Sequence, residues 1–188
     1  MLDLSKNHLP NAIKINGKWF SIKTDFRVWL QFSKDLNKMR IDENETIDLS
    51  YLFKNEVPYI NMDAFKAIMD FFTNPNTTPK NDHSSEDERL IDYIEDGEYI
   101  YSAFMQLYSI DLVDIEVLHW HKFKALFVGI TDKTKYGQIL GYRGYEKETR
   151  KAEEVYEETK RIWSLPQIRT KKEEQALKEF SDMFTRKE

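Results

Sequence analysis

Apolar and polar residues alternate near the start of the chain and then follow a helical rhythm over most of its length. Residues 12–22 place Ile13 and Ile15 on one side, pass through Asn16-Gly17 and return as a second apolar-polar run. This arrangement is typical of a β-hairpin closed by a type I′ turn. A two-stranded ribbon is marginally stable alone, so we expect the hairpin to pack on helices.

Helical spacing of apolar residues then predicts a series of amphipathic helices. The predicted ranges are 25–39, 62–72, 85–108, 115–130, 134–142, 146–163 and 171–184. Thr24 is the expected N-cap of the first helix, and Ser85 with Glu88 forms a capping box for the third. Gly97, inside the third range, suggests that another element packs closely there. The predicted fold class is therefore mainly α, a helical domain with a short N-terminal β-hairpin packed on the helices.

One segment has the composition of a loop. Residues 73–84 contain two prolines and three asparagines but no large apolar residue. We place this loop inside a helical domain of residues 1–145. A charged C-terminal helical arm of residues 146–188 follows, and Pro166 interrupts it.

Composition excludes several classes of protein. The 188 residues carry a net charge of −5 and include no cysteine, which excludes a disulfide scaffold, a thiolate zinc site, an iron–sulfur cluster and a cysteine nucleophile. The longest apolar run, residues 125–130, is far short of the ~18 residues that span a bilayer. The first residues contain no apolar stretch typical of a secretory signal. We therefore expect a soluble intracellular protein without a membrane partner.

Charge is distributed unevenly along the chain. Residues 82–116 contain eleven acids and one base, Arg89, and so carry about −10. Acidic surfaces repel phosphate, on which affinity for nucleic acid depends, so the sequence predicts no nucleic-acid partner. The acidic block is either the solvated face of a helix or a docking face for a basic partner, and both interpretations stay open.

Motifs for catalysis are sparse. The sequence contains no Gly-x-Ser-x-Gly motif and no glycine-rich phosphate loop. Carboxylates and imidazoles suited to zinc or iron occur in one cluster, which consists of Asp111, Asp114, Glu116, His119 and His121. On a helix, however, His119 and His121 point about 200° apart. We expect His119 at the edge of the core and His121 in solvent. The sequence thus predicts a non-enzymatic protein with no metal, cofactor or catalytic residue; a host-directed metalloenzyme or nuclease on this cluster is the alternative.

Aromatic residues are abundant, and most follow helical spacing. Trp120, Phe123 and Phe127 are predicted to be core residues. The candidate partner-binding residues lie in the charged C-terminal arm and are Trp163, Leu165, Ile168, Leu177, Phe180 and Phe184. This arm either docks a partner or folds back on the domain, and the sequence favours neither.

Three stretches resemble a known family. The first is Asp-Gly-Glu-Tyr-Ile-Tyr-Ser-Ala-Phe at 96–104, and the third is Ile-Leu-Gly-Tyr-Arg at 139–143. The second begins with Tyr-Ser-Ile-Asp-Leu at 108–112 and continues to Phe127; its most specific part is Leu-His-Trp-His-Lys-Phe-Lys-Ala-Leu at 118–126. Together with Leu9-Pro10 before the hairpin, they are similar to the bacteriophage gene-product-fifteen family of tailed phages and prophages of Gram-positive hosts. The resemblance covers about residues 8–165, and His121 stands where many members have a second tryptophan.

The resemblance implies a role in building the phage tail. The expected function is that of a non-enzymatic tail assembly chaperone or scaffolding factor, which binds the tape measure protein and the major tail protein of the tail tube. A second tail assembly chaperone is a further candidate partner. Such a protein works in the host cytoplasm and is absent from the mature virion. The alternative is a structural tail completion or connector protein that is retained in the virion. The family has no defined active site, so no functional residue is transferred.

Overall fold

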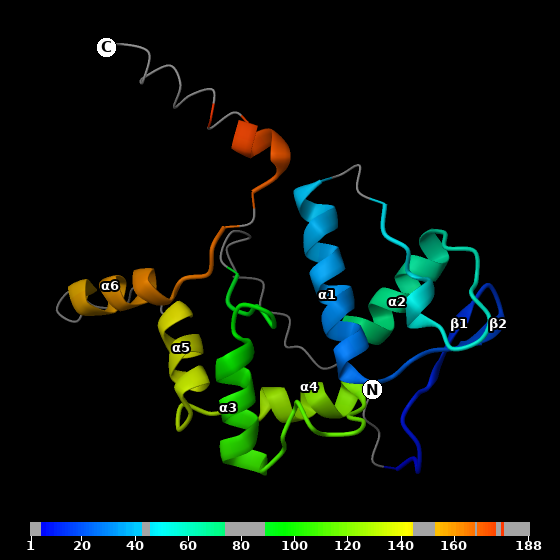
Figure 1. Cartoon of the computed structure of the whole chain (residues 1–188), viewed down its shortest axis with the longest axis horizontal. Helices are drawn as coiled ribbons and strands as arrows, with labels where there is room; N and C mark the ends of the chain where they lie inside the picture. Colours follow the sequence, from blue (N-terminus) through cyan, green and yellow to red (C-terminus); the bar gives the residue numbers. More distant parts are fainter. Residues whose placement is uncertain are drawn as a thin grey trace.

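The computed structural model of the protein describes residues 5–42, 46–73, 89–144, 153–167, 169–175 and 178. The elements follow in the order β1 (Ala12–Ile15), β2 (Lys18–Ser21), α1 (Phe26–Ile41), the 3₁₀ turn η1 (Ser50–Leu52), α2 (Met62–Thr73), α3 (Gly97–Tyr108), α4 (Trp120–Val128), α5 (Lys135–Arg143) and α6 (Glu153–Trp163). In Figure 1 the hairpin lies beside α2, and α6 lies beyond α5 at the opposite side of the molecule. The mainly α class with an N-terminal hairpin packed on helices is thereby confirmed.

The hairpin forms because its turn residues accept left-handed backbone. Asn16 and Gly17 have φ values of 48° and 84°, as a type I′ turn requires. The antiparallel register pairs Ile15 with Lys18 and Ile13 with Phe20. Ile13 and Phe20 are both buried, and β1 packs on α2, so one face of the ribbon is part of the core.

Aromatic rings connect the helices. Phe123 on α4 stacks on Phe26 of α1 and Phe104 of α3, with ring centroids 4.9 and 5.1 Å apart. Trp120 on α4 stacks on Phe72 of α2 at 5.2 Å. Trp120, Phe123 and Phe127 are at most 7% exposed, which confirms that they are core residues. The short helix α4 thus supplies the rings that join α1, α2 and α3 in the aromatic core.

Helix α1 is capped by Asp25, so the expectation of Thr24 was wrong by one residue. The Asp25 carboxylate accepts from the backbone N–H of Arg27 at 3.0 Å and from that of Leu118 at 3.1 Å. The carboxylate therefore satisfies two backbone donors from segments far apart in the sequence, and the Thr24 hydroxyl is not needed for the cap.

Helix α4 begins at Trp120, five residues later than predicted. The Arg27 guanidinium donates to the carbonyl oxygens of Leu112 and Ile115 at 2.9 and 2.8 Å. These bonds hold residues 111–119 in an irregular loop against the start of α1, because the carbonyls point to the guanidinium rather than along a helix axis. His119 then caps α4 by accepting from the backbone N–H of His121.

Helix α3 begins at Gly97, whereas the sequence predicts a helix from residue 85. The Asp92 carboxylate accepts from the backbone N–H groups of Ile94 and Glu95 at 2.7 and 3.0 Å, which stabilises turns over residues 93–96. A Cβ on Gly97 would meet nothing within 4 Å, so the expected close packing there is wrong. The capping box of Ser85 and Glu88 lies outside the described residues.

Glycine is required at position 137 in α5. A Cβ there would lie 2.0 Å from the carbonyl oxygen of Thr131. We expect Gly137→Ala to lower the free energy of unfolding by about 1–3 kcal/mol, because the backbone has to move apart. The matched control is Gly141→Ala on the same helix, where nothing lies within 4 Å; it should stabilise by about 0.5–1 kcal/mol. Urea denaturation measures both, and equal effects would contradict the prediction.

The end of the chain follows the predicted order. Helix α6 ends at Trp163, before Pro166. Residues 171–175 are helical again, and they begin with a capping box in which the Glu173 carboxylate accepts from the Thr170 N–H while the Thr170 hydroxyl accepts from the Glu173 N–H. Most of the predicted loop 73–84, and residues 146–152 of the predicted helix 146–163, lie outside the described residues. No helix in the described ranges has the length and apolar character to cross a membrane.

Candidate functional site

A buried ion pair joins the start of α3 to the end of α5. The two N–H groups at the end of the Arg143 guanidinium donate to the two carboxylate oxygens of Asp96 at 2.7 and 2.8 Å. The two side chains are only 7% and 2% exposed. Burial of such charges is favourable only when all their hydrogen-bonding groups have partners. The remaining partners of this pair therefore indicate what it holds in place.

These partners come from the loop before α3, from the end of α6 and from α5 itself. Arg143 also donates to the carbonyl oxygens of Leu90 and Trp163 at 3.0 and 2.6 Å. The Tyr136 hydroxyl donates to the Asp96 carboxylate at 3.2 Å, and burial together with that carboxylate raises the tyrosine pKa. Arg143 thus connects the loop before α3, helix α5 and the end of α6.

A second arginine reaches the same C-terminal residues. Arg89 forms a 2.6 Å ion pair with Asp92 and donates to the carbonyl oxygen of Pro166 at 3.1 Å. Together with Arg143 on Trp163, two guanidinium groups hold the backbone at residues 163–166 against the loop before α3. The cluster thus orders the chain beyond α6.

Two of the six candidate partner-binding residues lie in the described part of the chain. Trp163 packs edge-on against Tyr99 with ring centroids 5.7 Å apart, and the Lys135 ammonium lies 4.5 Å from the indole centroid. Trp163 and Leu165 are both partly buried. Ile168, Leu177, Phe180 and Phe184 lie outside the described residues.

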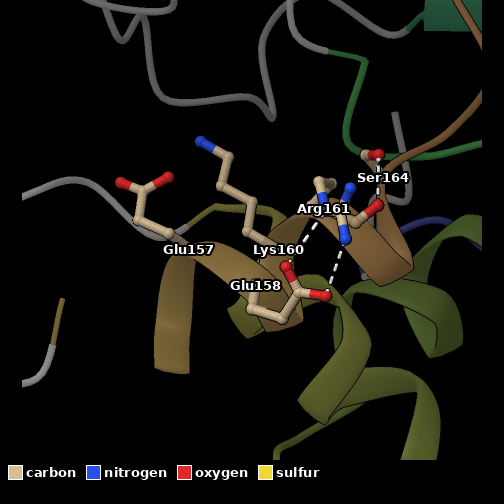
Figure 2. A pocket seen from close by; sticks show the side chains of 5 residues that line it. All are labelled: Glu157, Glu158, Lys160, Arg161 and Ser164. Atoms are coloured by element: carbon tan, nitrogen blue, oxygen red, sulfur yellow. Dashed lines mark hydrogen bonds and ion pairs between the residues drawn. The ribbon is translucent and has the colours of Figure 1, made fainter. Parts of the chain in front are cut away.

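Helix α6 also exposes apolar residues that the sequence analysis did not select. Val155 and Ile162 are 75% and 65% exposed and lie seven residues apart on one side of the helix. The outer surface of the helix carries a shallow, open depression, shown in Figure 2, lined by Glu157, Glu158, Lys160, Arg161 and Ser164. Within it Arg161 pairs with Glu158 at 2.8 Å. An open, charged depression suits contact with another protein better than a small-molecule ligand.

The histidines of the predicted metal cluster have structural partners. His121 is 4% exposed, so its expected position in solvent was wrong. Its Nε2 atom lies 3.0 Å from the carbonyl oxygen of Phe71, and Nε2 of His119 lies 3.0 Å from that of Pro10. Both rings therefore carry a proton on Nε2, since a carbonyl oxygen can only accept.

Helix α4 uses three side chains to cap the end of α2. Besides His121 on Phe71, the Trp120 indole and the Lys124 ammonium donate to the carbonyl oxygen of Phe72 at 3.0 and 2.5 Å. Carbonyl groups at the last turn of a helix have no partner within that helix, so these bonds fix α4 to α2. The burial that allows this contact lowers the Lys124 pKa to about 8.

Asp111, a carboxylate of the same cluster, also has structural partners. Asp111 accepts from the backbone N–H groups of Val113 and Asp114 at 2.8 and 3.1 Å and from the Tyr101 hydroxyl at 3.1 Å. The two backbone bonds lower its pKa. Among the described residues, no three carboxylates or imidazoles come together as metal ligands.

Acid should destabilise the fold through His121. Burial lowers the pKa of this imidazole to about 4, whereas an unfolded histidine has a pKa of about 6.5. Between pH 4 and 6.5 the unfolded chain binds more protons than the folded chain. The contribution of neutral, buried His121 to the free energy of unfolding is therefore fully present above pH 6.5 and is lost as the pH decreases to 4. The slope should approach ~1.4 kcal/mol per pH unit. His119, whose pKa burial also lowers, adds to it.

Urea denaturation at several pH values measures this slope. His121→Gln keeps an amide donor for the Phe71 carbonyl but does not titrate, so the slope should become smaller. His8→Gln makes the same substitution at an exposed histidine and is the matched control. An equal slope in wild type and in His121→Gln would contradict the assignment.

Comparison with known proteins shows which family the chain belongs to. A family model described as Bacteriophage Gp15 protein matches residues 5–165 of the 188-residue chain. The chain belongs to this Gp15 family. The match confirms the resemblance inferred from residues 96–104, 118–126 and 139–143. No curated protein and no solved structure matches the chain.

The residues that carry the Gp15 resemblance form the structural contacts described above. Asp96 and Arg143 come from the first and third stretches and meet in the buried pair. The second stretch, residues 118–126, supplies the aromatic core and the cap of α2. Sequence reasoning missed the Asp96–Arg143 pair, because 47 residues separate its members and each occurs among other charges. The only signal was their presence in the stretches that resemble the family.

Proposed function

We propose that this Gp15 protein acts in phage tail assembly as a non-enzymatic chaperone or scaffolding factor, and that it binds the tape measure protein and the major tail protein in the host cytoplasm. The observation that carries the proposal is membership of a bacteriophage family over residues 5–165. The structure adds support of a general kind, since exposed apolar residues of α6 are suited to contact with another protein.

The physical role that we propose for α6 is reversible contact with apolar helical segments. Val155 and Ile162 form a stripe one side chain wide on a helix whose other exposed residues include charged ones such as Glu158 and Arg161. Such a narrow stripe buries little area, so it favours an interaction that can be released when assembly is complete. Trp163 and Leu165, at and just after the end of α6, are partly buried and so keep part of their apolar surface accessible.

Co-expression with the tape measure and major tail proteins of the same phage tests the proposal. We expect a soluble complex on size-exclusion chromatography. Replacing both Val155 and Ile162 by Asp should weaken it about tenfold or more, because charges would then occupy the apolar contact. Val128→Asp is the matched control, since Val128 is 82% exposed on α4. Co-elution with neither protein would contradict the proposal.

Virion composition separates the chaperone from the alternative of a retained tail completion or connector protein. A chaperone should be absent from purified particles by mass spectrometry. Detection of the protein in a fixed copy number would favour the structural alternative. Deletion of residues 166–188 should weaken the complex if the arm provides anchors, and an unchanged complex would exclude that part of the proposal.

A further inference from the structure

The outer face of the hairpin carries an exposed tryptophan among lysines. The register of β1 and β2 pairs Lys14 with Trp19, so both side chains point away from the buried pair of Ile13 and Phe20. Trp19 is 65% exposed. A large aromatic side chain in this position has no role in the core and is available for contact with another surface.

Two more lysines share this face. Lys23 follows Trp19 by four residues, and Ile22 between them is buried, so the alternation of a strand turns Lys23 outward. The backbone N–H of Lys54 donates to the Ser21 carbonyl oxygen at 3.0 Å, next to the bridge between Ile22 and Phe53. Lys14, Lys23 and Lys54 are exposed, and none forms an ion pair with a described residue. We call Lys14, Trp19, Lys23 and Lys54 the basic hairpin face.

A surface of the opposite kind lies between α3 and α4. Val113 and Val117 are 73% and 64% exposed, and Asp114 and Glu116 between them are exposed as well. We call residues 113–117 the acidic loop. Arg27 donates to the carbonyl oxygens of Val113 and Ile115 at 3.2 and 2.8 Å, so the loop is fixed before any partner binds. A fixed loop loses little conformational entropy in a contact.

We propose that the basic hairpin face of one copy of the chain binds the acidic loop of a second copy. The two surfaces are complementary in charge and in apolar content, since lysines would face Asp114 and Glu116 while the Trp19 ring would cover the exposed valines. A second copy of the chain is the partner that we propose, because each copy carries both complementary surfaces. The contact joins two different patches, so it is head-to-tail and leads to a ring or an open array rather than to a two-fold dimer.

Sedimentation velocity of the full chain from about 1 to about 500 μM tests the proposal. We expect association that increases with concentration and weakens between about 50 and about 500 mM salt. The double variant Lys14→Glu/Lys54→Glu, or Asp114→Asn/Glu116→Gln, should weaken it about tenfold or more. The control is Lys34→Glu/Lys66→Glu, which makes the same charge change at exposed lysines of α1 and α2 and should leave association unchanged.

Mixing the two double variants shows whether the contact is head-to-tail. Each variant keeps one intact surface, so an equimolar mixture should form a 1:1 dimer that does not grow further. Wild-type protein that is monomeric at every concentration would overturn the proposal, as would variants that associate like wild type or a mixture that forms no dimer. None of these results depends on the phage partners, so they stand apart from the proposed tail function.

Discussion

Arg143→Met should be among the most destabilising single substitutions, with an expected loss of about 3–5 kcal/mol in the free energy of unfolding. The loss arises because the Asp96 carboxylate, 2% exposed, would keep its charge without its partner. The carbonyl oxygens of Leu90 and Trp163 would also lose a donor. Urea denaturation followed by circular dichroism measures the change.

Two further variants test this explanation. The pair Asp96→Leu/Arg143→Met should be more stable than Arg143→Met alone, because no buried charge remains unpaired. Arg161→Met removes one partner of an exposed ion pair on α6 and should have little effect. If Arg143→Met and Arg161→Met behaved alike, the pair of Arg143 and Asp96 could not be a main contact of the fold.

Phe123→Ala should cost about 3–5 kcal/mol, because it leaves a cavity in the aromatic core. The ring of Phe123 stacks on Phe26, Phe104 and Trp120, which come from α1, α3 and α4. The neighbouring rings cannot fill such a cavity unless the helices that carry them shift toward it. Thermal and urea denaturation measure the loss.

Val128→Ala is the matched control for the core substitution, because Val128 lies on the same helix and is 82% exposed. It should change the free energy of unfolding by less than about 0.5 kcal/mol. Phe123→Leu should recover part of the stability, since it fills more of the cavity than alanine does. Equal stability of the alanine and leucine variants would contradict a packing role for the ring.

Short sequence patterns correctly predicted the elements whose structure depends mainly on neighbouring residues. The turn residues Asn16 and Gly17 fix the hairpin whatever surrounds it, and helical spacing placed α1, α2 and α5 within two residues of their ends. The core positions of Trp120 and Phe123 also followed from spacing, since a stripe of large aromatic residues on a helix has to be buried.

Predictions failed where distant groups override local preference. Residues 115–119 have apolar spacing suited to a helix, but Arg27, almost ninety residues earlier, donates to the carbonyl oxygen of Ile115 and holds this segment in a loop. His121 was expected in solvent because on a helix it would point away from His119 at the edge of the core, but the carbonyl of Phe71 makes a buried position favourable. Because Arg27 and Phe71 are distant in the sequence from the residues that they contact, local sequence patterns do not reveal these partners. For the same reason the Asp96–Arg143 pair was not found, and the two described residues of the predicted partner-binding set remain a prediction.

The start of α1 shows how late the fold can be completed during synthesis. Thr24 and Phe26 exchange backbone hydrogen bonds with Trp120 and Leu118 at 2.7 and 2.8 Å, and Asp25 pairs with His119 in the same bridge. The first helix therefore lacks its N-terminal partners until about residue 120 has left the ribosome. Contacts of such sequence separation slow folding, since a long loop must close before they form. A fragment that ends before α4 should consequently remain unfolded, and the native fold is reached only when most of the chain has been made.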